Sequence, residues 1–181
     1  REGIGAVADP IAPRPILLVT SAANPFTSYY TEILRAEGLN AFDVQDIVSV
    51  TAAPAVLSSY DVVILGEMSL SPSQATLFSA WVNAGGNLIA MRPDEDLYPL
   101  LGLSPTQDEV PNGYLLFNAA ARPAAGLVGE TIQFHGVADV AVLDGASALA
   151  TLYSGAGSSG PTSAARGTGS KSRSRAASDG A

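Results

Sequence analysis

The sequence YDVVILGEMSLSPSQATLFSAWVNAGGNLIAMRP, residues 60–93, decides the fold class of this chain. It contains two short apolar runs, residues 61–66 and 87–91, which are typical of strands buried on both faces. Between them, Ser71 is followed by a proline and then a glutamine, a pattern that predicts a capped helix start. The helix is expected to end at Gly85. A strand, a helix and a second strand in this order predict a parallel pair with a crossover helix.

The same alternation extends to both sides of this unit. Residues 16–19 predict another buried strand, residues 27–37 a helix, residues 40–47 a strand and residues 54–57 a short helix. After it, residues 96–103 predict a short helix. Four later runs predict antiparallel or mixed strands: residues 114–118, 131–135, 140–143 and 149–153. We therefore expect an α/β domain with a mostly parallel sheet, helices on both faces, and mixed strands in its C-terminal part.

Composition and charge exclude several classes of function. The chain has 181 residues and no cysteine, which excludes disulfides, a thiol nucleophile and thiolate metal sites. The formal net charge is −8, and the acidic residues concentrate before Ser154. An acidic body is repelled by phosphate, so we expect no nucleic-acid partner. No apolar run approaches the roughly 20 residues that span a bilayer, so we expect no membrane partner.

The composition divides the chain into three parts. Residues 1–14 are expected to form an irregular lead-in or linker, and residues 15–153 the α/β domain. Residues 154–181 are rich in Ser, Gly, Ala and Arg and contain no large apolar side chain, so we expect a disordered tail. Because the alternation of strands and helices stops abruptly at this point, we also expect the domain to be truncated.

Acidic residues follow two of the predicted strands. Ligands of open parallel sheets bind beyond the carboxyl ends of the strands, where Glu67 and Asp94 would lie, with Glu95 and Asp96 beside them. Such carboxylates can act as an acid–base pair or bind a hard cation. Alternatively, Asp94 caps the helix that follows it. The loop after the first strand has no glycine-rich phosphate pattern, so no nucleotide or other cofactor is predicted.

His135 is the single histidine and the only ordinary general base at neutral pH. It lies at the end of the predicted strand 131–135, where a structural role is the alternative. No Gly-x-Ser-x-Gly elbow is present, so no hydrolase triad is predicted. The candidate catalytic residues are His135, Glu67 and Asp94, and no residue is predicted to hold a metal.

The chain resembles the class I glutamine amidotransferase-like superfamily. The resemblance rests on PILLVTSAANPFTSYYTEILRAEGLNAF at residues 15–42, on the stretch quoted first, on LLGL at 100–103, and on GETIQFHGVADVAVLDGASALATLYS at 129–154. It is most similar to amidotransferase-like domains of large secreted bacterial multidomain proteins. The resemblance implies a three-layer flavodoxin-like fold, an extracellular location, and neighbouring modules of a larger chain as partners.

The chain departs from that family at its catalytic positions. The family carries a nucleophilic cysteine on a tight turn after a central strand, where this chain has Arg92, Pro93 and Asp94. His135 is followed two residues later by Val137 and not by the family's glutamate. Glutamine amidotransferase activity is therefore excluded. Related branches include sugar-metabolism domains and the trimerisation domain of some β-galactosidases, which implies a carbohydrate ligand by analogy.

Two functions follow from the sequence. The first is a non-catalytic binding or structural module of a secreted bacterial protein, with a link to carbohydrates. The alternative is a divergent hydrolase or isomerase that acts on a carbohydrate-like substrate and uses His135 with Glu67 or Asp94.

Overall fold

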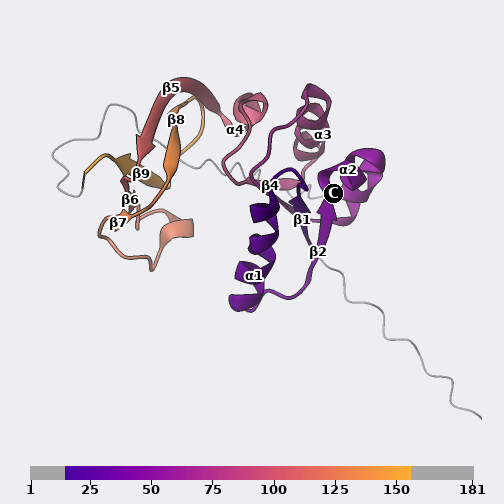
Figure 1. The fold of residues 1–181 in the computed structure, drawn as a ribbon, viewed down its shortest axis with the longest axis horizontal. Coiled ribbons are helices and arrows are strands. Elements are labelled where there is room, and N and C mark those ends of the chain that lie inside the picture. Colours follow the sequence, from indigo (N-terminus) through magenta and orange to yellow (C-terminus); the bar gives the residue numbers. More distant parts are fainter. Residues whose placement is uncertain (1–14, 156–181) are drawn as a thin grey trace, which may run out of the picture.

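The computed structural model describes residues 15–155, so the predictions for residues 1–14 and for the tail beyond residue 155 lie outside the described residues. Four parallel strands form one sheet in the order β2-β1-β3-β4: β1 (Ile16–Thr20), β2 (Phe42–Asp46), β3 (Val62–Leu65) and β4 (Asn87–Ala90). Three helices connect them: α1 (Tyr29–Ala36), α2 (Ile47–Ala52) and α3 (Pro72–Asn83). Figure 1 shows α1 on one side of the strands and α2 and α3 on the other. The predicted α/β class with a parallel sheet is confirmed.

The start of α3 is the helix boundary that the sequence predicts most sharply. The backbone N–H of Ser71 donates to Oε1 of Gln74 at 2.8 Å, and the N–H of Gln74 donates to Oγ of Ser71 at 3.4 Å. The predicted capping box is therefore confirmed. After the helix, Gly85 adopts a positive φ of 113°, which a glycine reaches without strain.

One face of the parallel sheet holds the core. Leu17, Val19, Val63 and Leu65 are at most 2% exposed and pack with Phe78 of α3. Each such buried side chain contributes roughly 1.5–3 kcal/mol of burial free energy. This face explains why the strand sequences read as continuous apolar runs.

The opposite face is covered only in its centre. Val44, Leu18, Ile64 and Ile89 lie in one row across the four strands. Leu18 is fully buried, whereas Val44 is 43% and Ile89 46% exposed. The sequence predicts helices on both faces of the sheet. Within the described residues, they cover the core face completely and the opposite face only in part.

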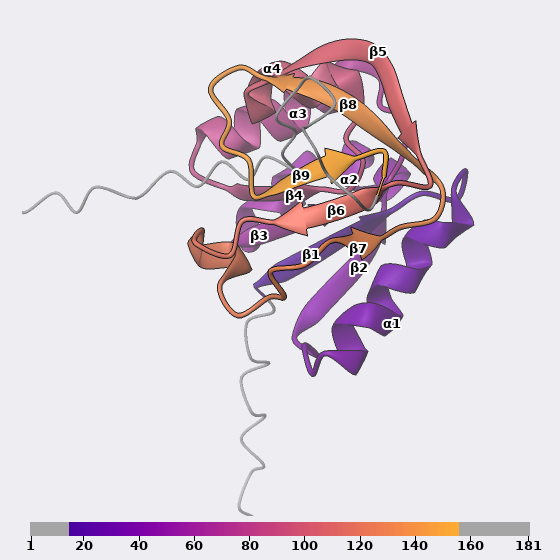
Figure 2. The same ribbon diagram turned by 90° about the vertical axis from the view of Figure 1, so that its left-hand side faces the viewer.

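The C-terminal part contains the short helix α4, two 3-10 helices at Glu95–Leu97 and Arg122–Ala124, and two antiparallel sheets. Strand β5 pairs with β8, and β6 pairs with both β7 and β9. The bounds are α4 (Tyr98–Leu101), β5 (Leu103–Pro111), β6 (Tyr114–Phe117), β7 (Ile132–Gln133), β8 (Val137–Leu143) and β9 (Ala150–Tyr153). Figure 2 turns this part of the molecule toward the viewer. The predicted mixed strands are thus present, and none of the helices in residues 15–155 is long and apolar enough to cross a membrane.

Strand β5 and helix α2 have no counterpart in the prediction, and the strand predicted over residues 40–47 is shorter than expected. Strand β5 contains Pro105 and Pro111, which central strands do not tolerate; within residues 15–155 it pairs with β8 alone, and its register shifts after Pro105. The strand predicted over residues 40–47 ends at Asp46. Its carboxylate accepts the N–H of Val48 at 2.9 Å and thereby starts α2.

The turn between α4 and β5 requires glycine at position 102, because a side chain there would collide with the neighbouring backbone. Its φ is +70°, and a Cβ there would lie 2.8 Å from the backbone nitrogen of Ala146. Gly38 has a similar φ of +81° but open space around it. We expect G38A to lower the free energy of unfolding by about 1–2 kcal/mol from conformation alone. G102A should cost at least about 1 kcal/mol more, because backbone atoms must shift.

Urea denaturation of both variants measures this difference. Equal losses in G102A and G38A would contradict the packing argument, since the two positions differ in their surroundings and share their backbone conformation.

Candidate functional site

The loop after β1 is attached to the loop after β3 by one asparagine. Nδ2 of Asn24 donates to the carbonyl of Glu67 at 3.0 Å, and its Oδ1 accepts the N–H of Phe26 at 3.2 Å. Behind it, buried Thr27 accepts the N–H of Ser21 at 3.0 Å. These bonds position the two loops at the carboxyl edge of the sheet.

The close approach of the two loops requires glycine at position 66. A Cβ on Gly66 would lie 2.8 Å from the methyl carbon of Thr27. Thr27 is 1% exposed and cannot move away without disturbing its hydrogen bonds. Gly66 therefore allows the backbone before Glu67 to pass directly over the first loop.

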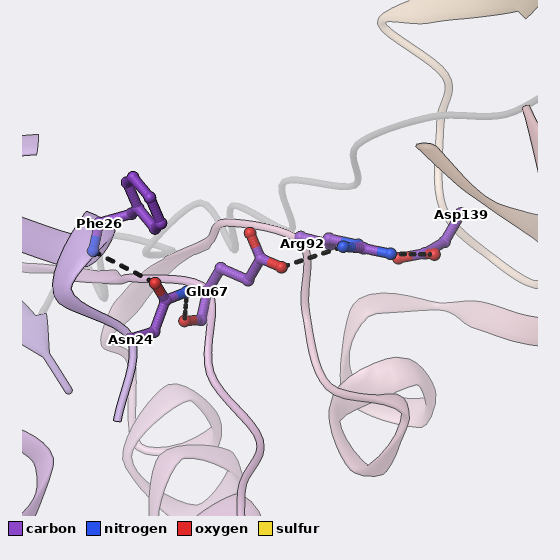
Figure 3. Close-up of polar contacts among 5 residues, drawn as sticks. All are labelled: Asn24, Phe26, Glu67, Arg92 and Asp139. Carbon is purple, nitrogen blue, oxygen red and sulfur yellow. Dashed lines mark hydrogen bonds and ion pairs between the residues drawn. The ribbon is translucent and has the colours of Figure 1, made fainter. Parts of the chain in front are cut away.

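Arg92 follows β4 and has a positive φ of 43°. This conformation is rare for a side-chain-bearing residue and costs on the order of 1–3 kcal/mol, so it persists only where the surroundings enforce it. Nε and Nη2 of Arg92 donate to the two carboxylate oxygens of Asp139 at 2.6 and 2.8 Å. Nη1 donates to Oε1 of Glu67 at 3.0 Å. Figure 3 shows the guanidinium between the two carboxylates.

The two-pronged ion pair changes the acid–base properties of its members. The hydrogen bond from Arg92 lowers the pKa of Asp139 below its usual value, although burial acts in the opposite direction. The hydrogen bond to Asp139 raises the pKa of Arg92. Asp139 is thus held as a carboxylate, which suits an acceptor of hydrogen bonds and not a general acid.

A polar pocket of about 530 Å³ opens at this edge. Its walls come from the ends of β1, β3 and β4 and from β8, and its polar lining residues are Ser21, Asn24, Glu67, Ser69, Arg92, Asp94 and Asp139. The strand order reverses between β1 and β3, and this switch point is where open parallel sheets bind ligands. The pocket therefore lies where the fold favours a binding site.

A second pocket of about 310 Å³ borders the same ion pair. Arg92 and Asp139 line both pockets. The remaining lining of the second pocket is apolar apart from Tyr98, and its larger members are Leu101, Leu103, Leu115, Phe117 and Leu152. The ion pair thus separates a polar compartment from an apolar one.

The structure brings Glu67 and Asp94 to the same pocket, as the strand ends predicted. Both oxygens of Asp94 are engaged, one with the N–H of Leu70 and the other with the N–H of Asp96, each at 3.0 Å. The alternative of a capping role for Asp94 is confirmed. Within residues 15–155, no three His, Cys, Asp or Glu side chains come together as a metal site, so the carboxylate cluster proposed as a cation site does not assemble there.

His135 lies elsewhere. Strand β7 ends at Gln133, so His135 falls in the exposed turn before β8 instead of ending a strand. It is not among the described residues that line the polar pocket. A catalytic role of His135 with Glu67 or Asp94 remains a prediction.

Sequence reasoning missed Arg92, Asp139 and Asn24 as site residues. Arg92 carried a usable signal, because a lone arginine directly after a buried strand projects a charge at the ligand-binding edge. No sequence signal marks Asp139 as a site residue. It reaches Arg92, which is 47 residues away in sequence, only because β8 packs beside the end of the parallel sheet.

The ion pair predicts how stability depends on pH. Asp139 has a folded-state pKa below its usual 3.8, so its contribution is present at neutral pH and is lost as the pH falls below about 5 toward the folded-state value. We expect wild type to lose more unfolding free energy between pH 7 and pH 3 than D139N does. Urea denaturation at the two pH values measures this loss.

Asp108 offers a matched control, because its carboxylate makes no hydrogen bond or ion pair with any residue in 15–155. D108N should retain the acid sensitivity of the wild type. A D139N variant that is as acid-sensitive as the wild type would show that the ion pair does not form.

The sequence matches no family model and no curated protein, whereas the fold matches solved structures. The β-galactosidase from Rahnella sp. R3 matches with a TM-score of 0.58 and 18% identity, over 86% of this chain and 27% of that one. The β-galactosidase from Bacillus circulans sp. alkalophilus matches with a TM-score of 0.59 and 16% identity, over 86% and 27%. A GH42 β-galactosidase from G. stearothermophilus matches with a TM-score of 0.57 and 13% identity, over 86% and 26%. The chain spans about a quarter of the length of these structures.

These matches correct the family resemblance drawn from the sequence. The matching structures are glycoside hydrolases and not glutamine amidotransferase-like proteins, so that family identification is wrong. The resemblance misled because alternating strands and helices are shared by many α/β families with unrelated functions. What this chain shares with the β-galactosidases, at identities of 18% and below, is a fold.

Proposed function

We propose that this chain serves a carbohydrate-related function and that its polar pocket binds a sugar. The observation that carries the proposal is an exposed aromatic pair beside the pocket. Phe26 is 70% and Tyr29 52% exposed, and their ring centroids lie 5.8 Å apart. Phe26 donates its N–H to Asn24, which lines the pocket. A sugar can place its C–H face on an aromatic ring while its hydroxyl groups bond to carboxylates and amides.

The charges of the pocket fit the same ligand class. Glu67 and Asp139 are acceptors for sugar hydroxyl groups, and Arg92 holds them in place without using all of its own N–H groups. The hydroxyls of Ser21 and Ser69 can both donate and accept. A phosphorylated ligand fits less well, because the pocket contains three carboxylates and a single cation.

The likeness to β-galactosidases supports the hydrolase alternative better than the non-catalytic module. Glycoside hydrolysis generally uses two carboxyl groups, one of them as an acid. Glu67 and Asp94 are the candidates in the polar pocket, and this form of the proposal does without His135.

Three finer assignments belong to the same proposal. The strand order β2-β1-β3-β4 supports a flavodoxin-like sheet. The limits of the domain at residues 15 and 153 and an extracellular location are proposed from the sequence.

Sugar binding can be tested at Phe26. We expect F26A to weaken binding of methyl β-D-galactoside by about tenfold, because it removes roughly 1.4 kcal/mol of contact with the sugar. Isothermal titration calorimetry measures the affinity. V48A serves as a control, because Val48 is equally exposed at 71% but lies on α2 and donates its N–H to Asp46, which does not line the pocket. Equal affinity in F26A and V48A would refute the stacking contact, and no binding by the wild type would refute the proposal.

Hydrolysis is tested with p-nitrophenyl β-D-galactoside. If Glu67 supplies acid or base catalysis, E67Q should lower kcat by roughly 100-fold or more. E130Q, which alters an exposed glutamate outside both pockets, should leave kcat unchanged. Binding without turnover in the wild type would favour the non-catalytic module.

A further inference from the structure

The apolar pocket has the size and lining of a compartment for an aromatic group. Its volume of about 310 Å³ exceeds the ~150 Å³ that accommodates a benzene molecule in a dry protein cavity. Its larger apolar lining residues are Leu101, Leu103, Leu115, Phe117 and Leu152, so the walls include α4, β5, β6 and β9, and β8 contributes Val137 and Ala141. Apolar walls that line open space lose the dispersion contacts that a ligand would restore.

One polar group on this wall has no hydrogen-bond partner among the residues that the structure describes. Tyr98 is 6% exposed and lines the pocket, and its hydroxyl makes no hydrogen bond with any residue in 15–155. Buried tyrosine hydroxyls usually have a partner. Burial raises the pKa of Tyr98, and the nearby Asp139 carboxylate raises it further, so the hydroxyl keeps its proton at neutral pH. It therefore offers a hydrogen-bond donor to an acceptor atom in the pocket.

The two pockets share the Arg92–Asp139 pair as a wall. A ligand with a polar part and an apolar part joined by one atom can place them on the two sides of that pair. An aryl glycoside has this construction: a sugar, an aromatic aglycone, and a glycosidic oxygen that accepts a hydrogen bond.

We propose that the apolar pocket binds the aromatic aglycone of a glycoside whose sugar lies in the polar pocket, and that the Tyr98 hydroxyl donates to the glycosidic oxygen. The inference rests on the proposed sugar binding and narrows it to one substrate class. Arg92 and Asp139 are positioning residues in this arrangement, because their ion pair defines the boundary between the compartments.

The test compares phenyl β-D-galactoside with methyl β-D-galactoside by calorimetry. Burial of the aryl ring should make the wild type bind the phenyl compound about tenfold more tightly. Y98F should weaken the binding of both galactosides by roughly fivefold, because both carry the glycosidic oxygen that accepts the hydrogen bond. The tenfold preference for the phenyl compound should remain, because it comes from burial of the ring. Y153F makes the same substitution in β9 outside both pocket linings and should leave both affinities unchanged.

A second measurement uses the wild type alone and therefore does not depend on whether Y98F folds. Intermolecular NOEs from the phenyl protons to the methyl groups of Leu115 and Leu152 are expected. Equal affinity for the two galactosides, or a phenyl ring that contacts neither leucine, overturns this inference and leaves the proposed function standing. Failure of both galactosides to bind overturns both.

Discussion

The bidentate ion pair between Arg92 and Asp139 is the interaction on which the candidate site depends. It joins the end of the parallel sheet to the β5–β8 ribbon, and the third guanidinium bond joins both to the loop after β3. Arg92 holds a backbone conformation that is strained for a non-glycine residue. The backbone strain and the hydrogen bonds are linked, because the left-handed conformation of Arg92 presents one side chain to a carboxylate in the loop after β3 and to another in β8 (Figure 3).

The sequence predicts an element correctly where local residues, such as helix caps, determine where that element begins and ends. The capping box at Ser71 and the positive φ of Gly85 mark the start and the end of a helix that the sequence alone predicts. Where tertiary structure decides, sequence patterns fail. Strand β5 contains two prolines, which are tolerated because, in the part of the chain that the structure describes, it pairs on one side only. Asp46 ends a strand and starts a helix in the same residue, which apolar periodicity does not reveal.

The sequence predicts where the site lies, but it predicts only some of the residues that form it. Strand ends place Glu67 and Asp94 at the carboxyl edge, because parallel strands end together there. Asp139 becomes part of the site only when β8 returns to Arg92, 47 residues away in sequence. His135 is a candidate on its chemistry alone, and it is not among the described residues that line the polar pocket. The family resemblance failed for a related reason, since a βαβ pattern specifies a fold class and leaves family and function open.

The most direct test of this account is the hydrogen exchange of the Arg92 side chain, followed by ¹⁵N NMR between pH 7 and pH 3. A guanidinium bound by two carboxylates should protect its Nε–H from exchange, and protection should fall in acid as Asp139 takes up a proton. Arg122 has no side-chain hydrogen bond to any residue in 15–155 and provides the reference for a free guanidinium. An Nε–H of Arg92 that exchanges as fast as that of Arg122 at pH 7 would contradict the account, because the two pockets would then share no fixed wall.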